Sequence, residues 1–325
     1  MPRLLLIGTG GTIAATAADA RRLTDYQVTE GIGAMLAAVP GAGELADIRC
    51  EQPFNTDSRA LRTPQVLQLA RRVGQAAADA SIDGIVITHG TDSLEETAFF
   101  LHLTAGGPTP VVLAGAMRPA SAPSADGPLN LLNALLVARD PASRDRGVLV
   151  AMNDRILSAR LATKGHTTRV DAFGADGLGV LGSVCDGQVR YHLRPEPRPA
   201  APVFALTGLR ALPAVDIIHD YQDAPLHPYQ SAIQSGARGI VVAGLGNGSL
   251  SPMAERGCAM AARRGLVCVR ASRVPRGSVT AKASDAGAGL LAAHELNPLQ
   301  ARIALRLALA HGLDRDAIDA LLQSL

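Results

Sequence analysis

Short apolar runs that end abruptly in small or polar residues dominate the pattern along this chain. The first, Leu4 to Ile7, is followed by glycine and threonine, and Ile85 to Thr88 is followed by histidine, glycine and threonine. Such runs, bounded by turn formers, are typical of strands buried on both faces of a sheet. Similar runs at Val111 to Ala114, Gly147 to Met152 and residues 239–243 predict further buried strands.

Segments with helical spacing separate these strands. The predicted helices cover Gly31 to Val39, Thr63 to about Ala80 with Thr63 as N-cap, Ser93 to Thr104, Asp126 to Ala138, Pro252 to Arg264, Asn297 to about His311, and Asp314 to Leu325. Strands that alternate with helices in this way indicate parallel pairing with right-handed crossovers. The predicted fold class is α/β, with a larger N-terminal, mostly parallel sheet that has helices on both faces, and a smaller C-terminal α/β domain.

The alternation breaks between about Arg190 and Pro213, where His192 to Pro199 is rich in proline and favours an extended linker. We therefore predict an N-terminal domain at 1–190, a linker at 191–213 and a C-terminal domain at 214–325. A length of 325 residues fits two domains.

Composition argues against several classes of protein. The net charge of +2 gives no electrostatic reason to expect a nucleic acid or a membrane as partner. No apolar run approaches the length of a membrane-spanning helix, and the N-terminus does not resemble a signal peptide. The cysteines have no metal-type spacing, which favours free, buried thiols in a reducing cytoplasm: Cys50, Cys185, Cys258 and Cys268.

The motifs also give little support for a cofactor or a metal. Gly8 to Thr12 is rich in glycine, but it is not G-x-G-x-x-G and it lacks the lysine of a P-loop. The eight histidines are scattered without metal-ligand spacing. Asn247 to Ser249 matches a glycosylation sequon, which we attribute to chance in a chain without an export signal.

Threonines carry the most suggestive chemistry. Thr12 and Thr91 each follow a glycine just beyond a predicted strand, where ligands bind in open α/β sheets. Threonine is a poor nucleophile without a base, and a lysine that loses solvent in a pocket could serve as one. Lys164 is the candidate, although its spacing alone favours a solvated lysine. Asp92 beside Thr91 suits a cationic substrate group.

Tyr26 ends a small, polar segment, Ala14 to Arg22 and beyond, that predicts a mobile surface loop. A tyrosine there is a candidate lid residue. Spacing alone favours the alternative, a surface tyrosine whose ring packs on its own loop.

The motifs together resemble the bacterial-type L-asparaginase family. The resemblance rests first on Thr9 to Ala14, His89 to Ala98 and Gly115 to Pro119. It extends into both predicted domains through Met152 to Asp154 with Lys164, Gly246 to Ser249, and Val274 to Gly277.

This resemblance implies an amidohydrolase that converts L-asparagine to L-aspartate and ammonia without a cofactor, with L-glutamine as a lesser substrate. It implies Thr12 as primary nucleophile, activated by Tyr26, and Thr91 with Lys164 as a second hydroxyl–base pair. It implies that Asp92 joins this pair and binds the α-ammonium. Backbone N–H groups near Thr91 would form an oxyanion hole.

The resemblance also implies Ser58 as ligand of the substrate α-carboxylate. Family members are usually homotetramers built from dimers, in which the neighbouring subunit completes each site, and Asn247 is the residue supplied in that way. The implied partners are therefore L-asparagine and further copies of the chain, with no nucleic acid or membrane, in the cytoplasm.

Two departures from the family pattern bear on the substrate. Arg59 stands where the family often has glutamine; its guanidinium could pair with the α-carboxylate and could alter the preference between asparagine and glutamine. The neighbouring subunit's glutamate is absent from Ser278 to Asp285. Either Ser284 or Asp285 replaces it, or Asp92 binds the α-ammonium alone.

Two alternatives stay open: an amidohydrolase of the same fold that prefers glutamine, and a catalytically silent amino-acid-binding protein. The presence of both threonines, Lys164 and Tyr26 argues against the silent protein. The near-neutral charge argues against a substrate carried on tRNA.

Overall fold

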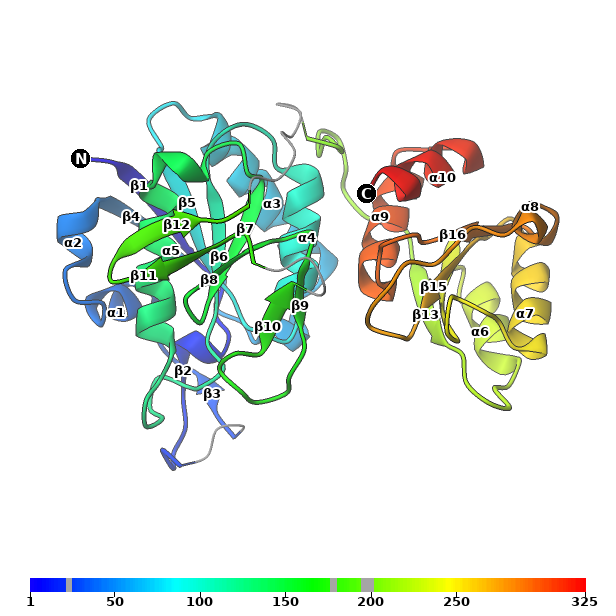
Figure 1. Ribbon diagram of the computed structural model, residues 1–325, viewed down its shortest axis with the longest axis horizontal. Helices are drawn as coiled ribbons and strands as arrows, with labels where there is room; N and C mark the ends of the chain where they lie inside the picture. Colours follow the sequence, from blue (N-terminus) through cyan, green and yellow to red (C-terminus); the bar gives the residue numbers. More distant parts are fainter. Residues whose placement is uncertain (22–24, 176–179, 194–201) are drawn as a thin grey trace. The chain divides into compact units, whose positions relative to one another are not determined.

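The computed structural model describes residues 1–21, 25–175, 180–193 and 202–325. The chain forms two compact units, Met1–Thr207 and Gly208–Leu325, which are described separately (Figure 1). Arg22 of the predicted loop and residues 194–199 of the proline-rich segment lie outside the described residues. The boundaries 1–190, 191–213 and 214–325 stay a prediction.

The first unit contains an eight-stranded sheet with the order β12-β11-β8-β7-β6-β5-β1-β4. From β4 to β7 the neighbours pair in parallel, and from β7 to β12 they pair antiparallel. The strands are β1 (Arg3–Gly8), β4 (Asp47–Glu51), β5 (Gly84–Thr88), β6 (Val111–Ala114), β7 (Val148–Met152), β8 (Arg155–Ser158), β11 (Gly182–Cys185) and β12 (Gln188–Tyr191). The predicted mostly parallel sheet is confirmed.

Helices cover both faces of this sheet (Figure 1). One face carries α1 (Ile32–Ala37), α2 (Ala42–Leu45) and α5 (Gly127–Arg139), and the other carries α3 (Thr63–Ala78) and α4 (Leu94–Thr104). Side chains of a strand point alternately to its two faces, so Leu4 and Leu6 join the core under α5 while Leu5 and Ile7 are buried on the opposite face. Burial on both faces explains the continuous apolar runs.

The path of the chain through the sheet creates a crevice. After β1 the chain runs to the edge strand β4 and then crosses to β5 on the other side of β1. The helix that follows β1 lies on one face, and the helix that follows β5 lies on the other. The carboxyl ends of β1 and β5 therefore flank a topological switch point, the usual ligand site of open α/β sheets.

Shorter elements surround that crevice. The 3-10 turns η1 (Thr12–Ala14) and η2 (Ser58–Ala60) lie there, whereas η3 (Pro141–Ser143) precedes β7 at the opposite edge of the sheet. The segment predicted as a loop contains β2 (Ala15–Thr16), which pairs with β3 (Gln27–Val28), and β9 (Ala162–Lys164) pairs with β10 (Phe173–Ala175).

The second unit contains a parallel sheet with the order β13-β14-β15-β16. Its elements are β13 (Val215–His219), α6 (His227–Gln234), β14 (Gly239–Gly244), α7 (Pro252–Ala262), β15 (Val267–Ser272), α8 (Ala283–Ala288), β16 (Leu290–Ala292), α9 (Pro298–Ala310) and α10 (Arg315–Ser324). Helices α6 and α7 pack around Tyr229 and Cys258 on one face, and α9 packs on the other. The smaller α/β domain is confirmed.

Local details correct two predictions. Thr63 is the first residue of α3, not its cap, because Arg62 occupies the cap position. All the cysteines are free, but Cys50 and Cys185 are exposed and only Cys258 and Cys268 are buried. Among the described residues, no helix is long and apolar enough to cross a membrane.

Candidate active site

Two glycine-containing turns meet where β1 and β5 end. Gly10 and Gly11 have φ values of 101° and 86°, a left-handed backbone that favours glycine. The backbone of Gly11 lies against that of Gly90, in the turn after β5. Since Thr12 and Thr91 are the next residues in each turn, this contact brings the two hydroxyl side chains to one place.

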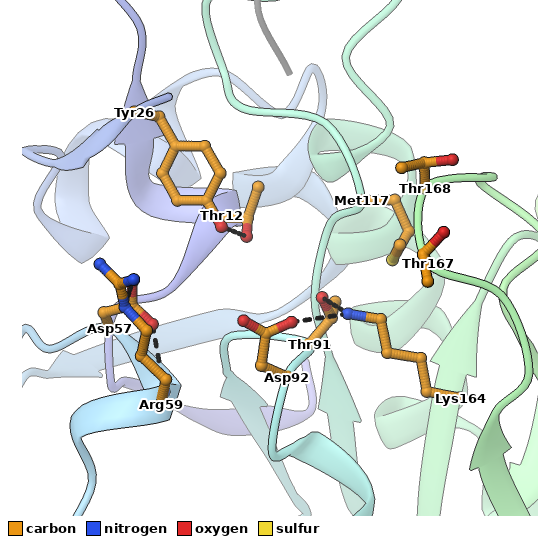
Figure 2. Close-up of a pocket in the computed structure, with 10 residues that line it drawn as sticks. All are labelled: Thr12, Tyr26, Asp57, Arg59, Thr91, Asp92, Met117, Lys164, Thr167 and Thr168. Carbon is orange, nitrogen blue, oxygen red and sulfur yellow. Dashed lines mark hydrogen bonds and ion pairs between the residues drawn. The ribbon is translucent and has the colours of Figure 1, made fainter. Parts of the chain in front are cut away.

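Both threonines line a single pocket at the carboxyl edge of the sheet (Figure 2). Its volume is about 200 Å³, which suits a ligand as small as one amino acid. The lining residues are Thr12, Tyr26, Asp57, Arg59, Thr91, Asp92, Met117, Lys164, Thr167 and Thr168. Of the side chains predicted for the site in this unit, only Ser58 is missing from the lining.

Thr12 and Tyr26 form the first polar pair of the pocket. The Thr12 Oγ1 and Tyr26 hydroxyl atoms are 2.8 Å apart, which is hydrogen-bond distance. Thr12 is only 5% exposed, so its hydroxyl has little access to solvent. The alternative of a tyrosine that only packs on its own loop is therefore wrong, because the ring carries its hydroxyl to Thr12 (Figure 2).

Lys164, Thr91 and Asp92 form the second polar group. The Lys164 ammonium donates to Thr91 Oγ1 at 3.0 Å and to Asp92 Oδ1 at 2.7 Å. The Lys164 side chain is 17% exposed, so the alternative of a solvated lysine is wrong. Asp92 is 53% exposed, and its second carboxylate oxygen is available to a ligand in the pocket. Lys164 ends β9, and its side chain extends to Thr91 and Asp92 (Figure 2).

His89 supports the turn that carries Thr91. Its Nδ1 lies 2.7 Å from the carbonyl oxygen of Gly90, and the side chain is fully buried. Burial lowers the pKa of His89 to about 4, against a weaker opposing effect of the hydrogen bond with Gly90. The imidazole is therefore neutral near pH 7 and donates from Nδ1 to Gly90. No spacing rule predicted this role for His89.

The substrate loop is only partly as predicted. Ser58 is 4% exposed, and its hydroxyl packs so tightly on Gly90 that a Cβ at Gly90 would lie 2.6 Å from Ser58 Oγ. The Arg59 guanidinium is 79% exposed, and its Nε lies 3.0 Å from Asp57 Oδ2. Asp57 thus places a second carboxylate at the pocket, which the sequence reasoning missed.

Three further lining residues were also missed. Met117 lies inside the motif Gly115 to Pro119, which supported the family resemblance but received no role of its own. Thr167 and Thr168 follow β9 and have no periodicity that could have indicated a pocket.

The second unit holds the other predicted residues. Asn247 lies in the exposed loop after β14 and hydrogen-bonds to the segment around Thr280. Asp285 accepts two hydrogen bonds from the buried Arg270. Burial alone would raise the pKa of Asp285, but the hydrogen bonds from Arg270 and from the Lys282 N–H hold it below the usual range. Asp285 is therefore paired within its own unit, which argues against the suggestion that it replaces the missing glutamate; Ser284 is exposed.

Comparisons with known proteins agree with this architecture. The family model "Asparaginase, N-terminal" matches residues 3–197, and "Glutaminase/Asparaginase C-terminal domain" matches residues 214–322. L-asparaginase 2 of Bacillus subtilis is 41% identical over 321 residues, which cover 98% of this chain and 86% of that protein. Glutaminase-asparaginase of Pseudomonas fluorescens is 37% identical over 314 residues, 95% of this chain and 86% of that protein.

A solved structure resembles the whole chain. It is described as a probable cytoplasmic L-asparaginase from Campylobacter jejuni, with a TM-score of 0.96, 39% identity and full coverage of both chains. The two family models span almost the entire sequence in order, so this chain belongs to the asparaginase family of amidohydrolases.

Proposed function

We propose that this chain is an L-asparaginase that converts L-asparagine to L-aspartate and ammonia, with L-glutamine as a lesser substrate. The observation that carries the proposal is that two hydroxyl groups, each hydrogen-bonded to a group able to exchange a proton, line one pocket of amino-acid size. The L-asparaginase names of similar proteins support the choice of substrate.

In the proposed reaction Thr12 Oγ1 attacks the side-chain amide carbon of asparagine. Tyr26, 2.8 Å from Thr12 Oγ1, relays a proton: its oxygen accepts the Thr12 hydroxyl proton as the new bond forms, while its own hydroxyl proton passes to the amide nitrogen. The amide oxygen gains negative charge, which backbone N–H groups of the turns stabilise, each typically by about 2.7–4 kcal/mol. The amide nitrogen gains a proton and leaves as ammonia, and water then hydrolyses the acyl–threonine ester.

The Thr91, Lys164 and Asp92 group serves the second half of this reaction. Thr91 Oγ1, held by the 3.0 Å hydrogen bond from Lys164, positions the attacking water, whose proton passes to Thr12 Oγ1 as the ester bond breaks. Asp92 holds Lys164 in place and directs its free oxygen to the substrate α-ammonium. Ser58 and Arg59 bind the α-carboxylate.

We further propose a homotetramer built from dimers, in which Asn247 of one subunit completes the site of another. We also propose a cytoplasmic location, as described for the Campylobacter jejuni protein. Sedimentation of the purified protein would test the tetramer, and cell fractionation would test the location.

The deciding experiment measures ammonia release from L-asparagine and L-glutamine side by side, with kcat/KM for each. We expect turnover of both, with asparagine preferred. Binding of asparagine without ammonia release would favour the silent binding protein. A higher kcat/KM for glutamine would favour a glutaminase, the second candidate, which the name of the Pseudomonas fluorescens relative makes worth testing.

A further inference from the structure

We propose that Arg270 is a positioning residue: with Asp285 it fixes the Asn247 loop so that Asn247 offers a hydrogen-bond acceptor to the α-ammonium of the substrate. The inference rests on the proposed function, in which Asn247 completes a neighbouring subunit's site. It also supplies a group that takes over part of the role of the missing glutamate.

The first observation is a buried charge. Arg270 lies on β15 between apolar residues and is only 1% exposed. Its Nε and Nη2 donate to the two carboxylate oxygens of Asp285 at 2.9 and 2.6 Å. Removing a charge pair from water costs several kcal/mol, and apolar residues often replace such a pair without loss of stability. Stability alone is therefore a poor reason for an arginine here.

The second observation concerns the other hydrogen bonds that the Arg270 guanidinium donates. Nη1 donates to the carbonyl oxygens of Gly248 at 3.1 Å and of Asn247 at 3.4 Å, and Nη2 donates to that of Thr280 at 2.9 Å. Gly248 has a φ of 67°, and a Cβ there would lie 3.0 Å from Arg270 Nη1. Arg270 thus ties the Asn247 loop to the segment that carries Thr280, and a glycine allows the close approach.

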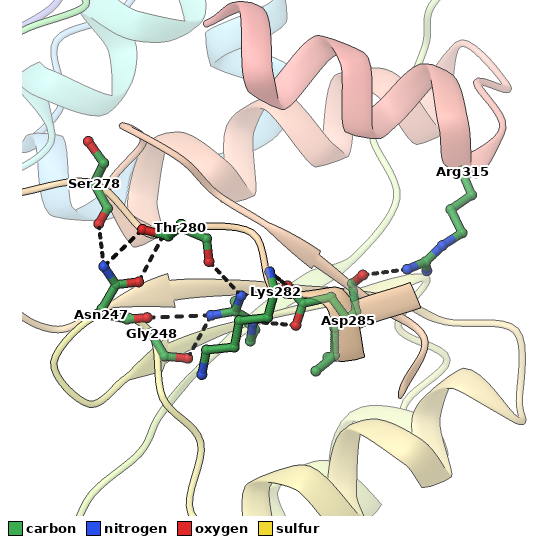
Figure 3. A network of polar contacts seen from close by, with 9 residues as sticks. Asn247, Gly248, Ser278, Thr280, Lys282, Asp285 and Arg315 are labelled. Atoms are coloured by element: carbon green, nitrogen blue, oxygen red, sulfur yellow. Dashed lines mark hydrogen bonds and ion pairs between the residues drawn. The ribbon is translucent and has the colours of Figure 1, made fainter. Parts of the chain in front are cut away.

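The third observation concerns the Asn247 carboxamide, which points toward Ser278 and Thr280 (Figure 3). Its Nδ2 donates to the Ser278 carbonyl oxygen and to Thr280 Oγ1, both at 3.2 Å. Its Oδ1 accepts the Thr280 N–H at 2.8 Å. Both protons of the amide are used, whereas an amide oxygen accepts a second hydrogen bond. The group that Asn247 still offers outward is therefore an acceptor, which suits an ammonium and not a carboxylate.

The test compares two competitive inhibitors that differ in the α-ammonium, L-aspartate and succinate, in the assembled wild-type enzyme and in Arg270→Lys. Lysine keeps the positive charge but lacks the branched guanidinium that hydrogen-bonds to Asp285, to the Asn247 loop and to the segment that carries Thr280. We expect the inhibition constant of aspartate to rise about tenfold and that of succinate to change less than about twofold, with kcat for asparagine nearly unchanged.

Two controls isolate the Asn247 loop. Arg315→Lys removes another guanidinium, one that donates to the carbonyl oxygens of Gly289 and Leu290 and not to the Asn247 loop. It should leave the inhibition constants of aspartate and succinate unchanged. In an Asn247→Ala background, Arg270→Lys should have little further effect, because the two residues act as one unit.

Three results would overturn the proposal. Arg270→Lys could weaken inhibition by aspartate and by succinate equally, or leave both inhibition constants unchanged. It could also have its full effect in the Asn247→Ala background. If Arg270→Lys does not fold, the variant Thr280→Val, at an exposed residue, tests the proposal instead. It removes the Oγ1 acceptor of Asn247 Nδ2 and should weaken aspartate selectively, and unchanged constants would overturn the proposal. The proposed function fails separately, by the absence of ammonia release in the wild type.

Discussion

Gly11 lies so close to Gly90 that a Cβ built on Gly11 would be 2.1 Å from the Gly90 Cα and 2.3 Å from its nitrogen. The turns after β1 and β5 therefore touch backbone to backbone, which no residue with a side chain would permit at Gly11. This contact explains how Thr12 and Thr91, far apart along the chain, come to line one pocket. The glycines of both motifs thus determine the geometry of the site directly.

Gly11→Ala should disable the enzyme. The new Cβ clashes with backbone atoms, and the φ of 86° is strained for alanine, so the two turns must separate. We expect kcat/KM for asparagine to fall at least about 100-fold, since misplacement of reacting groups by about 1 Å can have such an effect, and the thermal midpoint to fall as well.

The matched control for this prediction is Gly33→Ala. Gly33 lies within α1, and a Cβ there meets nothing within 4 Å. Because alanine is favoured over glycine in a helix by about 0.5–1 kcal/mol, this variant should be at least as stable as the wild type and fully active. A fully active Gly11→Ala variant would contradict the role of the glycine contact.

Thr12→Ala and Thr91→Val should each remove nearly all turnover and leave the fold intact. Each change deletes a hydroxyl that hydrogen-bonds in the pocket, to Tyr26 and to Lys164 respectively. We expect less than about a tenth of the wild-type kcat, equivalent to a barrier higher by more than about 1.4 kcal/mol. Steady-state kinetics measure turnover, and circular dichroism checks the fold. A variant that keeps more than about a tenth of the wild-type kcat would contradict the catalytic role assigned to that threonine.

The sequence predicted the buried parallel core well, because strands covered on both faces are continuous apolar runs. It did not predict β4, whose side chains are mostly exposed or half-buried and carry no such run. It also did not predict the antiparallel extension that begins at β8. There Asn153 and Asp154 have φ values of 49° and 61°, the left-handed pair of a tight hairpin turn. In the sequence these residues stand out only as part of a motif, Met152 to Asp154, and not as a turn.

The site was predictable wherever a motif places a side chain at the end of a strand. Thr12, Thr91 and Asp92 follow β1 and β5 directly, so the topology fixes their position. Lys164, by contrast, comes from β9, outside the main sheet: it was a candidate base from the residues, but its spacing favoured a solvated lysine, and the family resemblance implied its role. Asp285 shows the opposite case: a carboxylate in the expected region is unavailable because a buried arginine, distant in sequence, binds it.

Tyr26→Phe tests the first hydroxyl pair. The change keeps the ring on its loop and removes only the oxygen that lies 2.8 Å from Thr12 Oγ1. Because acid–base catalysis typically contributes about 10²–10⁴-fold, we expect kcat to fall at least about 30-fold while KM changes little. Tyr221→Phe, at a 47% exposed tyrosine of the second unit, should have no effect. Unchanged kcat in Tyr26→Phe would exclude Tyr26 from the proton transfer.

Arg59→Gln should change the ratio of glutaminase to asparaginase activity. The Arg59 guanidinium lines the pocket and pairs with Asp57 at 3.0 Å, so its removal alters both the room and the charge around the substrate. The pair itself is exposed and should contribute little to stability. The measurement is kcat/KM for both amides, and an unchanged ratio would exclude Arg59 as a determinant of substrate preference.

Arg49→Gln is the matched control for Arg59. Arg49 is 76% exposed on β4 and pairs with Glu51, also at 3.0 Å, but it does not line the pocket. The two variants remove similar exposed ion pairs, so a change in the substrate ratio that appears only in Arg59→Gln must come from the pocket.

The buried His89 predicts a specific dependence of stability on pH. Its pKa is about 4 in the folded chain, and the ordinary value of about 6.5 applies when the chain unfolds. Between these values only the unfolded chain takes up the proton, so stability is complete above about pH 6.5 and falls toward pH 4, by about 3 kcal/mol in total. Thermal midpoints at pH 7.5 and 4.5 should therefore converge in His89→Gln, while the exposed His219→Gln keeps the wild-type difference. If His89→Gln shows the same difference as the wild type, the neutral buried imidazole is not the source of the pH dependence.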